Sequence, residues 1–322
     1  MDMPTLPRTI DVLLYEGVNA IDVSGPSQAF DYARRGDRRA YVLRYVSLDG
    51  ARVRASCGLS LAPDGCLSAD EGSDLLVPGG VGVDDVMQDA TLRELVQARA
   101  ARDGDSRLIS ICSGALVLAA AGVLDGHTAT THWSREPDVR QFPGVTWDLD
   151  RIYVASDRIF TSAGVTTGID LALAIIRKDC GNEAALTVAR ELVMQLRRTG
   201  GQSQYAMHLA GQFAREGGLG RLIETVIGDP HRAWTLEDLA TEAGMNRRTL
   251  SRAFQRHLST PPAQFVERVR VDHARGLLEE AVPLKLVARQ SGFGDVQRMR
   301  RAFQRRYGMS LQQYAAAFGR DA

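Results

Sequence analysis

The chain has 322 residues, of which 44% are hydrophobic and 24% charged, a composition typical of a globular protein with two domains. Lysine and arginine balance aspartate and glutamate at 39 each, so the net charge excludes no class of partner. No apolar stretch approaches the roughly 20 residues of a membrane span, and the N-terminus lacks the pattern of a signal peptide. We therefore expect a cytoplasmic protein with no membrane partner.

Four scattered cysteines indicate free thiols rather than a disulfide framework in a chain of this length; they are Cys57, Cys66, Cys112 and Cys180. The histidines form no HxxxH pair and the cysteines no CxxC pair, so we predict neither a metal site nor another cofactor. The glycine-rich segment PGGVGVDD at residues 78–85 lacks the order that nucleotide-binding loops require.

Short apolar strands alternate with helices through the first two thirds of the chain. Strands are predicted at residues 10–14, 41–47, 75–78, 108–112, 152–155 and 159–161. Helices are predicted at 24–34, 91–103, 114–122, 168–176 and 184–197, with Pro26 in the first turn of the first one. Continuous apolar strands between helices favour an α/β domain with a parallel sheet covered on both faces.

The segment ISICSGALVL at residues 109–118 is the most informative pattern of this region. An apolar strand ends at Cys112, and Ser113 and Gly114 lead straight into a helix. A nucleophile on such a sharp turn lies beside backbone N–H groups that can stabilise a thiolate or an oxyanion. The alternative interpretation is a buried structural cysteine at the end of a strand.

The composition changes at about residues 198–220, where glycine and glutamine are frequent and periodicity is weak, as in a linker. Beyond it the sequence is helical and basic. Residues 221–322 hold 17 lysines and arginines against 11 acids, whereas residues 1–220 hold 22 against 28. A basic third on a neutral protein agrees with polyanion binding by that third alone.

Residues 236–314 contain one small unit twice, and the pentapeptide RAFQR occurs at both 252–256 and 301–305. Each copy has a small residue, a glycine four residues later, an apolar residue six or seven further on, and a phenylalanine one turn beyond. These are Ala240, Gly244, Leu250 and Phe254, then Ala288, Gly292, Met299 and Phe303. The small residue lets two helices cross closely, and the glycine permits the positive φ of a tight turn. The spacing predicts two helix-turn-helix units.

The side of each second helix opposite its predicted core carries arginine and glutamine, whose side chains reach base edges and phosphates in a major groove. The candidate DNA-binding residues are Arg247, Arg248, Arg252 and Gln255 in the first unit, and Gln297, Arg298 and Arg301 in the second. We expect double-stranded DNA as the partner. The alternative is a pair of amphipathic hairpins with solvated basic faces.

This duplicated unit resembles the DNA-binding module of AraC-type transcription regulators, in which a long helix joins two helix-turn-helix units. The resemblance implies that this helix starts near Pro262. Its buried stripe would contain Val266, Val269, Leu277 and Ala281. The closing segment RRYGMSLQQY at 305–314 is similar to the family's end signature, but Leu311 stands where a proline usually follows the serine.

The segments LYEGVNAIDVSGP, LLVPGG, ICSGALVLAAAGVLDGHTATTHW and FTSAGVTTGIDLALAII resemble the ThiJ/PfpI branch of the class I glutamine amidotransferase-like fold. Nearly the whole chain then resembles the GlxA type of AraC-family regulator. This implies a flavodoxin-like parallel sheet domain at 8–197, a linker at 198–220, and an all-α domain with two helix-turn-helix units at 221–320. The implied ligand pocket contains Asp22, Gly79, Gly80, Cys112 and Ser113, with His132 near its rim.

The same comparison argues against a complete catalytic site, and we assign no catalytic residue. Peptidases of the fold place a histidine directly after the nucleophile, where this chain has Ser113. The isonitrile-hydratase branch has an acid, the cysteine and a hydroxyl residue, which Asp22, Cys112 and Ser113 fit better. A hydratase or amidase therefore stays the alternative to a regulator. His132 also fits a packed, hydrogen-bonded residue, and we expect His273 on the apolar stripe of the linking helix. We expect a regulator whose N-terminal domain binds a small effector or forms a homodimer.

Overall fold

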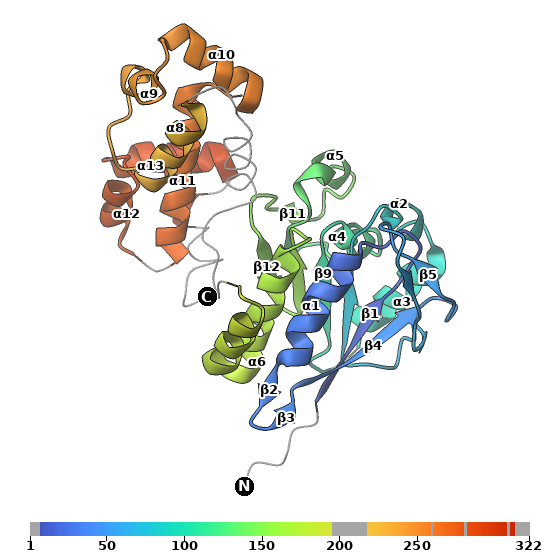
Figure 1. Ribbon diagram of the computed structural model, residues 1–322. Helices are drawn as coiled ribbons and strands as arrows, with labels where there is room; N and C mark the ends of the chain where they lie inside the picture. Colours follow the sequence, from blue (N-terminus) through green and yellow to red (C-terminus); the bar gives the residue numbers. More distant parts are fainter. Residues whose placement is uncertain are drawn as a thin grey trace. The chain divides into compact units, whose positions relative to one another are not determined.

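The computed structural model describes residues 7–102, 104–194, 218–258, 260–279, 282–307 and 310–312. The chain divides into two compact units, Met1–Arg198 and Thr199–Ala322 (Figure 1). The predicted linker lies outside the described residues except at 218–220, and so does Ala281. In the described part of the chain, no helix combines the length and the hydropathy of a membrane span.

The first unit is built on a seven-stranded sheet with the order β12-β13-β9-β8-β1-β4-β7. The strands are β1 (Arg8–Leu13), β4 (Tyr41–Ser47), β7 (Gly65–Cys66), β8 (Asp74–Val77), β9 (Arg107–Ile111), β12 (Tyr153–Ser156) and β13 (Ile159–Ser162). Every neighbouring pair is parallel except the edge pair of β12 with β13. Every residue of β8 and β9 is buried, as expected for central strands of a sheet covered on both faces. The predicted parallel α/β domain is confirmed.

Helices cover this sheet. They are α1 (Ala20–Tyr32), α2 (Val83–Val86), α3 (Ala90–Ala100), α4 (Gly114–Ala120), α5 (Glu136–Val139) and α6 (Thr167–Glu191), with a 3-10 turn, η1, at Trp133–Arg135. Figure 1 shows α1 and α6 side by side on one face, while α3 and α4 contact each other and β9. Three short two-stranded sheets, β2 (Arg34–Arg35) with β3 (Arg38–Arg39), β5 (Val53–Arg54) with β6 (Ser60–Leu61), and β10 (Thr128–Ala129) with β11 (Thr146–Trp147), complete the unit.

Two helix predictions need correction. Helix α1 begins at Ala20 because the Asn19 side chain accepts a hydrogen bond from the Ile21 N–H (2.9 Å), so Pro26 lies inside the helix and not in its first turn. The helices predicted at 168–176 and 184–197 correspond to the two halves of α6, which are separated by Gly181 with non-helical φ of 89° and ψ of 171°. The second half ends at Glu191 and not at residue 197.

The second unit is helical, as predicted. Its elements are α8 (Leu219–Gly228), α9 (Leu236–Glu242), α10 (Arg247–Leu258), α11 (Pro262–Glu279), α12 (Leu284–Gln290) and α13 (Val296–Tyr307). The long helix α11 starts at Pro262, where the resemblance placed it, and supplies Phe265 to one apolar core and Val271 to a second. Each helix-turn-helix unit therefore has its own core, and α11 belongs to both.

The stripe of α11 is partly as predicted. Val266 and Val269 are buried and Leu277 is half-buried. His273, expected on this stripe, is exposed, because the buried face at that level is formed by Val271 and Ala274 on either side of it in sequence.

Candidate functional site

The eight repeat positions take the structural roles that their spacing predicts. Ala240 and Ala288 are buried in the apolar cores of their units, and Gly244 and Gly292 have φ values of 64° and 78°. The four apolar positions of the second helices are fully buried: Leu250, Phe254, Met299 and Phe303. Both helix-turn-helix units are thereby confirmed at the level of local geometry.

The second helix of each unit is fixed at its start by a capping side chain at the same repeat position. Asn246 Oδ1 accepts a hydrogen bond from the Thr249 N–H (2.9 Å). Asp295, which lies 49 residues later, accepts from the N–H groups of Gln297 (3.2 Å) and Arg298 (3.0 Å). These bonds lower the pKa of Asp295 below its usual value. Both candidate recognition helices, α10 and α13, thus begin at defined residues.

All seven candidate DNA-binding side chains lie on the exposed face of α10 or α13. They are Arg247, Arg248, Arg252, Gln255, Gln297, Arg298 and Arg301. Arg247 forms an ion pair with Glu237 of α9. Within the described part of the chain, Arg248, Arg252 and Arg301 form no ion pair, so their guanidinium groups are available to a polyanion.

The two helix-turn-helix units of the C-terminal domain are held together by polar contacts as well as by α11. The Arg270 guanidinium donates to the Pro230 carbonyl (2.9 Å) and to the Arg232 carbonyl (2.8 Å). Gly292, in the turn of the second unit, packs against the same segment: a Cβ there would lie 2.3 Å from the Pro230 oxygen. The turn of the second unit therefore contacts the segment that leads into the first.

In the N-terminal α/β unit of the chain, Cys112 lies at a sharp turn between β9 and α4. Its φ of 57° is rare for a residue other than glycine and is characteristic of a nucleophile elbow. The turn is crowded, because a Cβ on Gly79 or Gly164 would lie 2.7 Å or 2.1 Å from the Cys112 Cβ. Because glycine has no Cβ, the backbone at these two positions can approach the cysteine this closely.

Asp22 lies beside the cysteine and is fully buried. Its Oδ1 accepts a hydrogen bond from the Val165 N–H (2.8 Å), and its Oδ2 accepts one from the Gly79 N–H (3.1 Å). Burial outweighs these bonds and raises the pKa of Asp22 to about 6. Burial and the Asp22 charge together raise the pKa of the Cys112 thiol to about 12, so the thiol form dominates at neutral pH.

Ser113 and Gly80 complete this cluster of residues around the cysteine, which we call the Cys112 pocket. The Gly80 N–H donates to Ser113 Oγ (3.2 Å), which joins the loop after β8 to the start of α4. The structure therefore brings Asp22, Gly79, Gly80, Cys112 and Ser113 together, as the resemblance implied.

His132 directly follows Thr131 in sequence, but the His132 ring contacts other residues. His132 Nδ1 is 2.7 Å from Ser134 Oγ, and the ring lies 5.4 Å from that of Trp133. Burial lowers the pKa of His132. The neighbouring Thr131 contacts the cysteine directly, since its hydroxyl donates to the Cys112 carbonyl (2.8 Å).

Sequence reasoning missed several residues around Cys112. Val165 and Gly164 contribute a backbone N–H and an absent side chain, and Thr131 bonds to the backbone of the elbow. The available signal for Gly164 is its position three residues beyond the strand predicted at 159–161. Nothing in the identity of Val165 indicates that its N–H is used.

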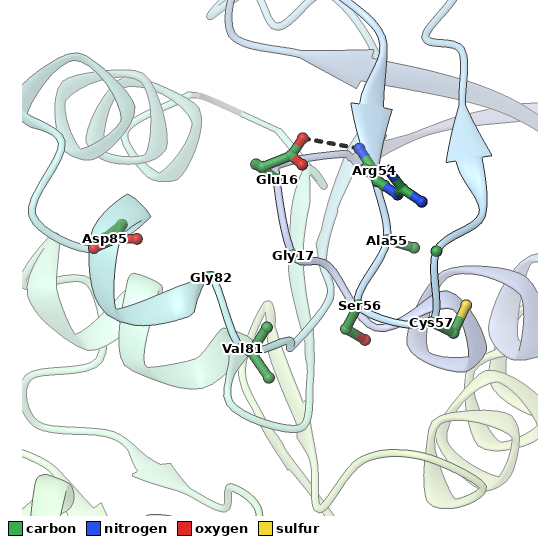
Figure 2. A pocket seen from close by; sticks show the side chains of 10 residues that line it. Glu16, Gly17, Arg54, Ala55, Ser56, Cys57, Val81, Gly82 and Asp85 are labelled. Carbon is green, nitrogen blue, oxygen red and sulfur yellow. Dashed lines mark hydrogen bonds between the residues drawn. The ribbon is translucent and has the colours of Figure 1, made fainter.

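A hollow of about 600 Å³ adjoins the loop after β8 (Figure 2). It is lined by Glu16, Gly17, Arg54, Ala55, Ser56, Cys57, Gly58, Val81, Gly82 and Asp85. Figure 2 shows the Glu16 carboxylate beside Arg54 of β5, where it accepts a hydrogen bond from the Arg54 N–H (2.8 Å). The loop after β8 thus gives Gly79 and Gly80 to the Cys112 pocket, and Val81 and Gly82 to the hollow.

The thiol chemistry of the described residues is consistent with the predicted free cysteines. Cys57 and Cys66 are exposed, Cys180 is half-buried and Cys112 is buried, and none forms a disulfide. Among the described residues, no group of three His, Cys, Asp or Glu side chains is placed to hold a metal ion.

Comparison with known proteins agrees with both halves of the chain. A helix-turn-helix domain model matches residues 239–317, and the DJ-1/PfpI family model matches residues 8–178. The HTH-type transcriptional regulator CdhR of Pseudomonas aeruginosa is 30% identical over 308 residues, covering 94% of this chain and 89% of CdhR. Isonitrile hydratase of Pseudomonas putida is 34% identical over 185 residues, covering 57% of this chain and 77% of the hydratase.

Solved structures support the same fold for the first unit. A ThiJ/PfpI family protein from Pseudomonas syringae has a TM-score of 0.54 at 24% identity, covering 74% of this chain and 91% of that protein. The relatives that match along nearly the whole chain are regulators, whereas the hydratase matches only the N-terminal part. The chain belongs to the AraC-type transcriptional regulators that carry a DJ-1/PfpI domain, and it is a DNA-binding regulator.

Proposed function

We propose that this regulator reads double-stranded DNA through the exposed faces of α10 and α13. The contacting residues are Arg247, Arg248, Arg252, Gln255, Gln297, Arg298 and Arg301. The observation that carries the proposal is the repeated arrangement of these side chains, on the exposed face opposite a fully buried Leu250 or Met299. Because α11 is part of both cores, it can hold the two recognition helices at a fixed spacing, which on B-DNA is about 34 Å.

Salt dependence of binding tests this proposal. A duplex that the full chain selects from a random library is titrated by fluorescence anisotropy at 50 mM and 200 mM salt. If the arginines release counterions at six or more phosphates, affinity falls by at least about 10³-fold between these concentrations. An affinity that does not change with salt would contradict an interface made of arginines.

We also propose that the first unit binds a small effector beside Cys112. Asp22, Gly79, Gly80, Cys112 and Ser113 form the floor of the site, His132 lies near its rim, and the adjoining hollow gives room for a small molecule. The support is the concentration of buried polar groups and a cavity around a single loop. The test is a metabolite screen by thermal shift on the full chain, repeated with Cys112→Ala. The proposal predicts that this variant changes the response to a hit and keeps DNA affinity.

We further propose that the protein acts as a homodimer in the cytoplasm, where DNA is accessible. Dimeric regulators bind repeated half-sites, so protein symmetry and operator symmetry correspond. Light scattering of the full chain, with and without the selected duplex, measures the oligomeric state. A monomer in both samples would contradict the dimer.

A hydratase or amidase activity is the second candidate, and two observations favour it. The N-terminal region is similar to isonitrile hydratase, and Asp22 lies beside the thiol of Cys112. The raised pKa of that thiol opposes it, because a thiol is a far weaker nucleophile than a thiolate. Turnover of an isonitrile or amide that Cys112→Ala abolishes would establish the activity. Without turnover, we expect the pocket to serve binding only.

A further inference from the structure

The two helix-turn-helix units differ in charge. Windows 235–258 and 284–307 correspond through the RAFQR repeat and have equal length. The first holds four basic residues against three acidic ones, and the second holds seven against one. The single acid of the second window, Asp295, caps α13, and Asp238 of the first window likewise accepts a hydrogen bond in the cap of α9. The positive charge of the C-terminal region is therefore concentrated in the second unit.

The first helix of each unit shows the difference most clearly. Among its charged residues, α9 has acids only, and α12 has bases only. These are Glu237, Asp238 and Glu242 in α9, and Lys285 and Arg289 in α12. The alignment that pairs the two small residues of the repeat places Lys285 at the position of Glu237. Since the first helix of such a unit crosses the phosphate backbone, α12 attracts DNA and α9 repels it.

Ion pairs occupy charged side chains in both units. Glu242 of α9 pairs with Arg232 (3.4 Å), and Arg306 of α13 lies 3.9 Å from Asp272 of α11. Glu237 pairs with Arg247, so one arginine of α10 is neutralised inside its own unit. In the second unit, Arg305 pairs with Glu267 of α11 (2.9 Å). Four further basic side chains of the second unit are exposed and form no ion pair with any residue that the structure describes: Lys285, Arg289, Arg298 and Arg301. In the first unit, Arg248 and Arg252 are in that condition, beside the acids of α9.

We infer that the second unit anchors the regulator to the phosphates of any duplex, while the first unit decides which sequence is held. The inference rests on the proposed function, since it divides that interface between two unequal parts. Acids on α9 oppose non-specific approach of the first unit. Base contacts from Arg248, Arg252 and Gln255 must overcome that repulsion, which happens only on a matching sequence.

Two double variants of the full chain test this division, each removing two exposed basic side chains. One is Lys285→Ala with Arg289→Ala in the second unit, and the other is Arg248→Ala with Arg252→Ala in the first. Each is titrated against the selected duplex and against a scrambled duplex of the same composition, at several salt concentrations. Thermal unfolding checks that both variants fold like the wild type.

The anchor variant is expected to lose affinity equally for both duplexes, and the slope of log affinity against log salt should fall by about 0.9 for each lost phosphate contact. The first-unit variant is expected to lose mainly the preference for the selected duplex. The reciprocal substitution Glu237→Lys should raise affinity for the scrambled duplex.

Equal losses of slope and of preference in the two variants would overturn the inference and leave the proposed function intact. A wild-type chain that binds neither duplex at low salt would instead overturn the proposed function.

Discussion

The Cys112 pocket and the two recognition helices use their polar groups in opposite ways. In the pocket, both oxygens of Asp22 accept backbone hydrogen bonds, and Ser113 bonds to Gly80. On the recognition helices, Arg248 and Arg252 are exposed and form no ion pair with a described residue. Groups satisfied inside the protein hold its conformation, whereas groups without a partner inside are available to another molecule. The recognition helices therefore depend on exposed side chains, whereas the Cys112 pocket depends largely on backbone groups.

The largest effect is expected from breaking the turn that positions the second recognition helix. Gly292→Ala places a Cβ 2.3 Å from the Pro230 oxygen at a positive φ, and should lower the free energy of unfolding by more than about 2 kcal/mol. The matched control is Gly244→Ala, which has a similar φ but nothing within 4 Å, and should cost about 1 kcal/mol. Denaturant unfolding of both variants measures the difference. Equal losses would show that the contact with Pro230 does not matter.

Removing one exposed arginine tests whether the side chains of the recognition helices contact DNA. Arg252→Ala should cost about 1–3 kcal/mol of binding free energy on the selected duplex if its guanidinium contacts a base in two places. Arg221→Ala, an exposed arginine of α8 outside the recognition face, is the control and should change affinity much less. Anisotropy titrations decide between them. If both variants bind like the wild type, Arg252 is not a contact residue.

In the Cys112 pocket, Asp22 makes the free energy of unfolding depend on pH. Folding raises the pKa of Asp22 from its ordinary value of 3.8 to about 6, so between these values the folded chain holds a proton that the unfolded chain has lost. This group therefore lowers the free energy of unfolding as pH rises through that window, by about 3 kcal/mol in all. Unfolding of Asp22→Asn at pH 4 and pH 6.5 should lack this contribution.

The matched control is Asp85→Asn, which removes an exposed carboxyl on the wall of the hollow. If Asp22→Asn and the wild type show the same dependence, the carboxyl of Asp22 is ionised throughout the window.

The smallest expected effect is a labelling rate. At pH 8 the thiol of Cys112 should resist iodoacetamide while the exposed Cys57 and Cys66 react, because burial and Asp22 raise the pKa of Cys112 to about 12. Mass spectrometry of peptides after timed labelling gives the three rates. Labelling of Cys112 as fast as that of Cys57 would show an activated thiol and would strengthen the hydratase candidate.

The elements that could be predicted from the sequence are those in which side-chain pattern alone decides the structure. Apolar runs gave the location of β4 and β9, and the spacing of Ala240, Gly244 and Leu250 predicted the turns and cores of the helical units. In the helical units the buried side chains follow the helical period, whereas β9 is apolar and buried along its whole length.

Other features depend on partners distant in sequence, so no local pattern predicts them. Asp11 and Asp74 lie fully buried in strands because Arg44, Arg99 and Arg107 reach them from other elements. Their charges would argue against buried positions if each strand were considered alone. The start of α1 differs from the prediction for a simpler reason: Asn19 caps the helix, so Pro26, a residue type common in first turns, lies inside it.

The candidate sites divide in the same way. The arginines of α10 and α13 could be named because their chemistry and their helical spacing are both visible in sequence. Around Cys112, sequence reasoning identified Asp22 and Ser113 but not Val165 or Gly164. These two act through a backbone N–H and through the absence of a side chain.

The most direct test of the central claim maps both recognition helices on one duplex. A DNA-cleaving iron chelate is attached at Gln255→Cys in one protein and at Gln304→Cys in another, each in a background with Cys57→Ser and Cys66→Ser. Both sites are exposed positions of the recognition helices. We predict two cleavage centres on the selected duplex about one helical turn, roughly 10 base pairs, apart. Cleavage by only one of the two proteins, or by neither, would contradict a regulator that reads DNA with both units together.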